Sequence, residues 1–117
     1  YPEARVIGLD IDPSRFCEDE LRAAGAFEEN FPVIIQFDAY MDPAEVLLDY
    51  TGGVDLFVDD GPHRADAISR AVTEFGPLMN PGGRFVVEDF PAAAPLMAAQ
   101  WPDAEIRSWG SIHAVWL

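Results

Sequence analysis

VDLFVDDGPH at residues 54–63 and LMNPGGRFVVEDF at residues 78–90 are the two stretches that decide the fold. Each contains a short apolar run, and each run ends in two acidic residues. Between them, apolar residues recur at helical spacing and predict an amphipathic helix over residues 64–75. These apolar residues are Ala65, Ile68, Val72 and Phe75. A buried strand, a helix and a second buried strand form the repeating unit of a parallel sheet that is covered by helices.

The same alternation of strands and helices precedes this unit. RVIGLD at residues 5–10 predicts a strand, and VIIQF at residues 33–37 predicts a second one. Between them, Asp12 suits an N-cap and Pro13 suits a first helical turn. We therefore expect a helix that begins after Asp12 and ends at about Ala24, where Gly25 supplies a C-terminal stop.

Further cap and turn signals complete this pattern. Asp42 and Pro43 repeat the cap and first-turn signature, and they predict a short helix that is ended by TGG at residues 51–53. NPGG at residues 80–83 predicts a turn before the RFVV strand, and Pro91 is expected to open another helix.

The last two runs are short, and the final one alternates with a period of two. They cover residues 104–109 and 111–117, are joined across Gly110, and predict an antiparallel hairpin at the edge of the sheet. The expected class is α/β, a doubly wound and mostly parallel sheet with an antiparallel C-terminal hairpin. Residues 1–117 are expected to form one domain.

Composition limits the partners. The 117 residues include 21 acids, seven arginines and no lysine, for a formal net charge of −14. This balance argues against binding to nucleic acid or to an anionic membrane. A single cysteine excludes an internal disulfide, and no cationic leader or spanning apolar run is present. We therefore expect a cytoplasmic protein.

Acidic residues stand at every predicted strand end, which is where open parallel sheets bind ligands. They are Asp10, Asp38, Asp59 with Asp60, and Glu88 with Asp89. Carboxylates that converge from neighbouring strands repel one another unless a cation lies among them, and oxygen ligands select a hard ion such as Mg²⁺. Alternatively, these acids cap helices, turn the chain or are simply solvated. The spacing of the acids alone favours neither the metal site nor this alternative.

His63 follows Asp60 by three residues across a Gly-Pro turn. Histidine can transfer protons near neutral pH, so it would serve as the general base beside a metal-bound hydroxyl. The alternative is a histidine without a role at the start of a helix. His113, inside the last strand pattern, is expected to be structural or exposed. The chain has no GxGxxG, and without lysine it has no P-loop.

These motifs together resemble class I S-adenosylmethionine-dependent methyltransferases, and among them the bacterial sugar O-methyltransferases of the macrocin and mycinamicin type. RVIGLDID looks like the strand whose acid binds the cofactor ribose, here Asp10. QFDAY is similar to the segment that meets the adenine, here through Asp38. We place Asp59 with these two as a cofactor-binding residue.

The same resemblance assigns the remaining acids. VDLFVDDGPH and LMNPGGRFVVEDF resemble the family's metal and base motifs, which implies Asp60, Glu88 and Asp89 as ligands of Mg²⁺ or another hard divalent cation and His63 as base. The family fold normally begins with a strand and a glycine-rich loop, and both lie N-terminal to everything present here. The first residue is also a tyrosine rather than methionine. The chain is therefore expected to be part of a methyltransferase domain.

Three functions follow from the sequence. The leading hypothesis is methyl transfer from S-adenosylmethionine to a hydroxyl of a small natural product, a sugar or a phenol. The alternative is a catalytically silent α/β module that pairs with a partner, or with itself as a homo-oligomer, through its sheet edges. A nucleotide-dependent oxidoreductase is the third, and the missing glycine fingerprint counts against it.

Overall fold

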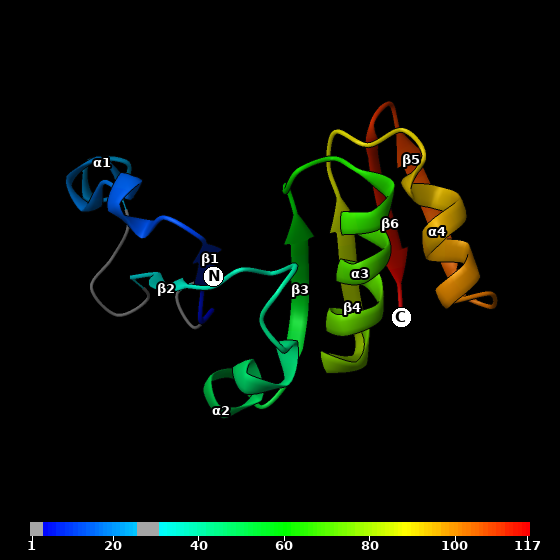
Figure 1. Ribbon diagram of the computed structural model, residues 1–117, viewed down its shortest axis with the longest axis horizontal. Helices are drawn as coiled ribbons and strands as arrows, with labels where there is room; N and C mark the ends of the chain where they lie inside the picture. Colours follow the sequence, from blue (N-terminus) through cyan, green and yellow to red (C-terminus); the bar gives the residue numbers. More distant parts are fainter. Residues whose placement is uncertain (1–3, 26–30) are drawn as a thin grey trace. The chain divides into compact units, whose positions relative to one another are not determined.

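The computed structural model describes residues 4–25 and 31–117, and it divides the chain into two compact units, Tyr1–Asp42 and Pro43–Leu117. In the first unit, β1 (Ile7–Asp10) pairs in parallel with β2 (Val33–Gln36). A 3-10 turn, η1 (Pro13–Arg15), and a helix, α1 (Glu18–Ala23), connect the two strands (Figure 1). A strand, a helical connection and a parallel strand are what the sequence predicted for this region.

The connection is not the continuous helix that we expected. Asp12 does cap the first turn, since its carboxylate accepts a hydrogen bond from the Ser14 amide at 3.3 Å. Phe16 and Cys17 then adopt extended backbone angles and separate η1 from α1. The Phe16 ring packs edge-on against Phe31, with ring centroids 6.4 Å apart. This packing takes Phe16 out of the helix.

The second unit carries a four-stranded sheet in the order β3-β4-β6-β5. β3 and β4 are parallel, whereas β6 is antiparallel to both β4 and β5. The α/β class and the C-terminal hairpin are thereby confirmed. In chain order the elements are η3 (Ala44–Leu47), α2 (Leu48–Thr51), β3 (Val54–Asp59), α3 (Ala65–Phe75), η4 (Gly76–Leu78), β4 (Met79–Val87), α4 (Ala93–Gln100), β5 (Glu105–Trp109) and β6 (Ile112–Trp116).

One face of this sheet is covered by α3 and α4 (Figure 1). An aromatic stack joins the layers: the ring centroids of Phe57 and Phe75 lie 4.5 Å apart, those of Phe57 and Phe85 4.7 Å, and those of Phe85 and Trp101 5.3 Å. The buried face of α3 consists of Ala67, Ile68, Ala71, Val72 and Phe75. Ala65, which we expected on this face, is exposed because it lies in the first turn of the helix.

Residues 80–83 do not form the predicted turn, because they lie within β4. The register steps from Val54↔Met79 to Leu56↔Arg84, so the segment bulges opposite Asp55. Asn80 closes the bulge with a hydrogen bond from its amide nitrogen to the Asp55 carboxylate at 2.8 Å. Glycine and proline here make a bulge instead of a chain reversal.

Asp42 does not cap the next helical segment either. Pro43 occupies the cap position without a side-chain hydrogen bond. The Asp42 carboxylate turns back and accepts a hydrogen bond from the Asp38 backbone amide at 2.9 Å. TGG ends the segment as expected, because Gly52 adopts a left-handed conformation with φ 66°. None of the helices within residues 4–25 and 31–117 has both the length and the apolar character that a membrane crossing needs.

Candidate metal centre and cofactor pocket

Three predicted site residues meet at the carboxyl ends of β3 and β4. Asp60, His63 and Asp89 each offer a ligand atom, and these atoms all lie within 4.8 Å of one another. The two strands are parallel neighbours with Asp59 opposite Val87. The Glu88 amide donates to the Asp59 carbonyl at 2.9 Å and continues the ladder by one residue. Both chain segments therefore leave the sheet side by side.

Two residues of this cluster have an unusual backbone conformation. His63 with φ 51° and Asp89 with φ 50° are the only residues other than glycine, within the described part of the chain, that have positive φ. The left-handed region crowds Cβ against the backbone and costs roughly 1–2 kcal/mol in other residues. Such strain persists where the surrounding structure enforces it, and it concentrates at functional sites.

The turn between β3 and α3 positions His63. The Asp59 carboxylate accepts a hydrogen bond from the Gly61 amide at 3.0 Å, and Asp59 is 5% exposed. Across this turn, His63 Nε2 lies 3.2 Å from Asp60 Oδ1. The side chains of His63 and Asp60 are 37% and 66% exposed, so an acceptor can reach both.

Arg64, the next residue, is committed elsewhere. Its guanidinium donates two hydrogen bonds to Asp66 in the first turn of α3. Hydrogen bonding from Arg64 lowers the pKa of Asp66 to about 2, and the same contact raises the pKa of Arg64. The positive charge nearest His63 along the chain is thus paired with Asp66.

Glu88 belongs to no such three-residue group among the described residues. Asp89, the next residue along the chain, belongs to the cluster instead. The predicted role of Glu88 as a metal ligand stays a prediction. The structure adds Ser111, whose hydroxyl donates to Asp89 Oδ1 at 2.9 Å. Sequence reasoning missed Ser111 because only the pairing of β4 with β6 brings it to Asp89.

The predicted cofactor acids have different surroundings. Asp38 lines a pocket of about 460 Å³ in the first unit, together with Ile11, Gln36, Phe37 and Asp42. Asp10 is exposed and accepts a hydrogen bond from the Asp12 amide at 2.7 Å, without lining this pocket. Asp59 is buried in the turn described above. Of the three acids, Asp38 is the one that lines this pocket.

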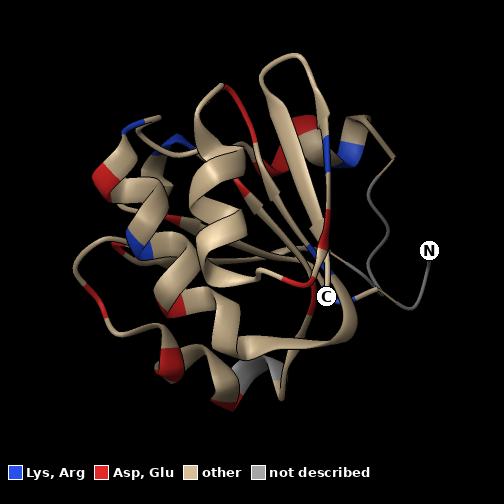
Figure 2. Ribbon diagram, turned by 90° about the vertical axis from the view of Figure 1, so that its right-hand side faces the viewer, with Lys and Arg blue, Asp and Glu red and all other residues tan. Residues whose placement is uncertain are grey.

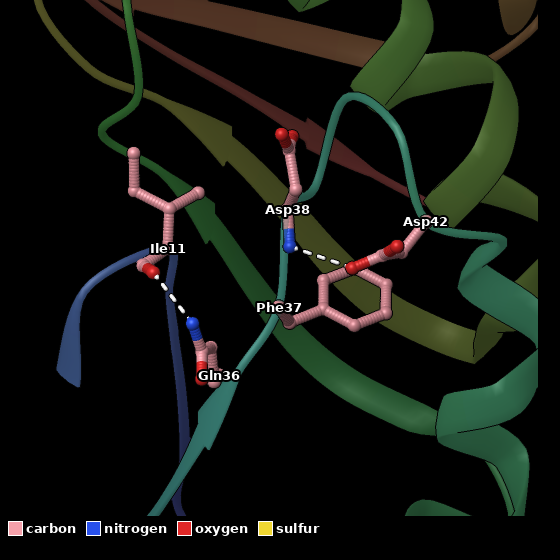
Figure 3. A pocket seen from close by; sticks show the side chains of 5 residues that line it. All are labelled: Ile11, Gln36, Phe37, Asp38 and Asp42. Atoms are coloured by element: carbon pink, nitrogen blue, oxygen red, sulfur yellow. Dashed lines mark hydrogen bonds between the residues drawn. The ribbon is translucent and has the colours of Figure 1, made fainter.

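Hydrogen bonds hold the walls of this pocket in place (Figure 3). The Gln36 side chain reaches from the end of β2 to the Ile11 carbonyl at 3.2 Å. Asp38 Oδ1 accepts from the Tyr40 amide at 2.9 Å, and Asp42 is bound to the Asp38 amide. Phe37 is 5% exposed and adds an apolar surface. A pocket with an aromatic ring and carboxylates suits a ligand that has a flat apolar part and hydroxyl groups.

The donor set of the cluster fits a magnesium ion. Mg²⁺ is commonly held by one or two carboxylates, and water or substrate oxygens complete the coordination. Asp60 and Asp89 supply two carboxylates, and both are exposed enough to leave room for other oxygen ligands. His63, as an imidazole, is a poorer ligand for this hard ion and is better suited to accept a proton.

No protein-family model matches the chain. A curated protein, the 8-demethyl-8-alpha-L-rhamnosyl tetracenomycin-C 2'-O-methyltransferase of Streptomyces olivaceus, is 38% identical over 100 residues. The chain is a relative of the class I S-adenosylmethionine-dependent methyltransferases. The match takes in 83% of the chain and 22% of the Streptomyces methyltransferase, so the chain spans about a fifth of that relative's length.

Solved methyltransferase structures share the fold. MycE, a methyltransferase from the mycinamycin biosynthetic pathway in complex with Mg and SAH, has a TM-score of 0.61 at 21% identity over 95% of this chain and 36% of its own. CalS11, a TDP-rhamnose 3'-O-methyltransferase, has a TM-score of 0.65 at 13% identity over 99% of this chain and 60% of its own. An rRNA methylase from Streptococcus thermophilus has a TM-score of 0.54 at 17% identity, over 95% of this chain and 70% of its own. The Rossmann-like methyltransferase fold is confirmed.

Proposed function

We propose that this chain contributes the metal-binding and proton-accepting part of an S-adenosylmethionine-dependent O-methyltransferase, which acts on a sugar hydroxyl of a natural product. The observation that carries the proposal is the cluster of Asp60, His63 and Asp89 at neighbouring strand ends. The Streptomyces relative, named for methylation of a rhamnosyl group, supports the reaction and the sugar. It favours a methyltransferase over the silent module and the oxidoreductase.

Asp60 and Asp89 would hold the cation, with Glu88 as the third ligand that the family resemblance implies. A bound Mg²⁺ supplies a Lewis acid, which lowers the pKa of a hydroxyl group placed against it. The carboxylates therefore serve to fix the acceptor hydroxyl beside His63. Magnesium in the MycE complex supports the choice of ion.

His63 would take the proton of the acceptor hydroxyl. Its contact with Asp60 orients the imidazole, and the carboxylate stabilises the imidazolium that forms. As the proton leaves, the acceptor oxygen forms a bond to the methyl carbon of S-adenosylmethionine. The carbon–sulfur bond breaks, and S-adenosylhomocysteine departs. Alignment of oxygen, carbon and sulfur is the main requirement for this displacement.

The pocket in the first unit would receive the adenosine part of the cofactor. Phe37 and Asp38 both line this pocket, and the Asp38 carboxylate would bind polar groups of the ligand. Asp10, one residue before the lining residue Ile11, is proposed to accept hydrogen bonds from the ribose hydroxyls. Asp59 is proposed as the third cofactor-binding residue, and it is buried in the turn that follows β3.

The acceptor is proposed to be a small molecule. Acidic residues are spread over helices, strands and loops, and arginines are few (Figure 2). A net charge of −14 repels phosphate backbones and anionic membranes, although the fold alone is shared with an rRNA methylase. A cytoplasmic location and self-association also stay proposals.

The test is methyl transfer by the complete protein from labelled S-adenosylmethionine to a rhamnosylated acceptor. His63→Ala is expected to lower kcat by roughly 10²- to 10⁴-fold, the usual contribution of a general base. Asp60→Asn and treatment with EDTA should also abolish most of the activity.

Asp66→Asn is the matched control, because Asp66 is an exposed acid three residues beyond His63 and is bound to Arg64. Its rate should stay near that of the unchanged protein. Full activity of His63→Ala, together with insensitivity to EDTA, would reject both assigned roles.

A further inference from the structure

We propose that Ser111, at the tip of the β5–β6 hairpin, is a positioning residue that fixes the carboxylate of Asp89 for metal binding. The inference rests on the proposed function, since it concerns the same cation site. Ser111 is contributed by a part of the chain that no metal or base motif in the sequence touches. Its hydroxyl donates to Asp89 Oδ1 at 2.9 Å.

The pairing of β4 with β6 brings Ser111 close to Asp89. β4 and β6 run antiparallel, and their last registered pair at this end is Val87↔His113. Asp89 lies two residues beyond Val87, the last residue of β4, and Ser111 lies in the hairpin turn, one residue before β6. The hydrogen bond between their side chains therefore lies just beyond the end of the ladder.

The hairpin holds the Ser111 hydroxyl in a narrow range of positions. Trp109 pairs with Ile112, so that Gly110 and Ser111 form a two-residue turn. Gly110 has φ 65°, as the first central residue of a type II′ turn requires. Below the turn, the Ser108 hydroxyl and His113 Nδ1 are 2.7 Å apart and connect the two strands.

Asp89 needs such an anchor because its own backbone does not hold it in a regular strand. It lies two residues beyond β4, has φ 50° and is exposed. A carboxylate has about four acceptor positions, so a hydrogen bond from Ser111 leaves others for a cation. Partners behind metal ligands orient them, and losing one typically costs 10- to 100-fold in metal affinity. The serine hydroxyl carries no charge, so its hydrogen bond to Asp89 orients the carboxylate without neutralising it.

The experiment measures Mn²⁺ binding to the complete protein by electron paramagnetic resonance, with no cofactor or acceptor present. Ser111→Ala is expected to raise the Kd for Mn²⁺ by about 10- to 100-fold. Ser111→Thr keeps a hydroxyl and should restore most of the affinity. Ser14→Ala is the control, because Ser14 also donates its hydroxyl to a carboxylate, that of Asp12 at 2.5 Å, outside the cluster.

Asp89→Asn separates the role proposed for Ser111 from the existence of the metal site itself. If the unchanged protein binds Mn²⁺, Asp89→Asn does not, and Ser111→Ala binds as tightly as the unchanged protein, then the role of Ser111 is wrong and the metal site stands. If the unchanged protein binds no Mn²⁺, both are wrong. A lower melting temperature of Ser111→Ala without any change in Kd would make Ser111 merely structural and would also overturn the inference.

Discussion

His63 combines a proposed chemical role with a backbone conformation that its side chain disfavours. Its φ of 51° lies in the left-handed region, which glycine adopts without steric cost and other residues adopt only with strain. It follows Pro62 in a turn that the Asp59 carboxylate and the Gly61 amide close. The imidazole thus reaches Asp60 from a conformation that costs folding free energy. Function and stability are opposed at this residue.

We therefore expect His63→Gly to be more stable than His63→Ala by about 1 kcal/mol, because glycine relieves the strain and alanine does not. Urea unfolding of the two variants measures the difference. Both should lose methyl transfer equally, since both lack the imidazole. Gly61→Ala is a comparison for the effect of strain on stability in the same turn, because Gly61 is not among the residues with positive φ. Equal stability of the two His63 variants would show that the backbone at this position is unstrained.

At the scale of elements, the ends of β3 and β4 depend on how tightly α3 and α4 pack on the sheet. Gly76 ends α3 at the place where the Trp101 ring approaches the chain, and a Cβ at Gly76 would lie 2.7 Å from that ring. Trp101 in turn packs against Phe85 in the middle of β4. Strand β4 is therefore linked to the end of α3 through one aromatic ring.

Gly76→Ala is expected to destabilise the fold by about 1–3 kcal/mol, the usual cost of overpacking a well-filled core. Chemical denaturation followed by tryptophan fluorescence measures the loss. Gly82→Ala supplies a contrast: nothing lies within 4 Å of a Cβ there, and the cost comes from its φ of 83° alone. If Gly76→Ala is as stable as the unchanged protein, Trp101 moves away freely and the proposed link is absent.

The whole chain carries a large negative charge, formally −14. With 21 acids and seven arginines, repulsion between carboxylates opposes folding at low ionic strength. Two of the described ion pairs, Arg22 with Glu18 and Arg107 with Glu105, each join neighbours on one element, and their side chains are partly exposed. Pairs of this kind contribute little to stability. Screening of the carboxylate repulsion by salt and binding of a cation at a specific site should both stabilise the protein. Experiments with two different salts can separate the two effects.

NaCl should raise the melting temperature by screening, and MgCl₂ at the same ionic strength should raise it further. A ligand that binds only the folded state adds about 2.7 kcal/mol at 100 times its Kd. Thermal unfolding in matched salts measures this excess, which Asp89→Asn should remove while the response to NaCl persists. Identical melting curves in the two salts would contradict a specific site.

Much of the architecture could be predicted from local patterns. The apolar runs, and the period-two alternation of the last one, located each strand that the described residues form, because burial on one or two faces requires those patterns, although β4 begins at Met79, before the predicted RFVV run. The errors came where a side chain had two possible partners. Asp42 binds the Asp38 amide instead of capping a helix, and NPGG forms a bulge instead of a turn. Such choices depend on which segment lies opposite, which local sequence does not contain.

By itself, the sequence determined the α/β class, the hairpin and the acids and histidine that follow β3 and β4, because these depend on hydrophobic period and on motifs within short segments. Only the tertiary structure decided which of those groups meet. Pairing of β3 with β4 brought Asp60 and His63 to Asp89, and left Glu88 outside the three-residue cluster. Pairing of β4 with β6 added Ser111. The physical reason is strand register, which residues far apart along the chain specify jointly.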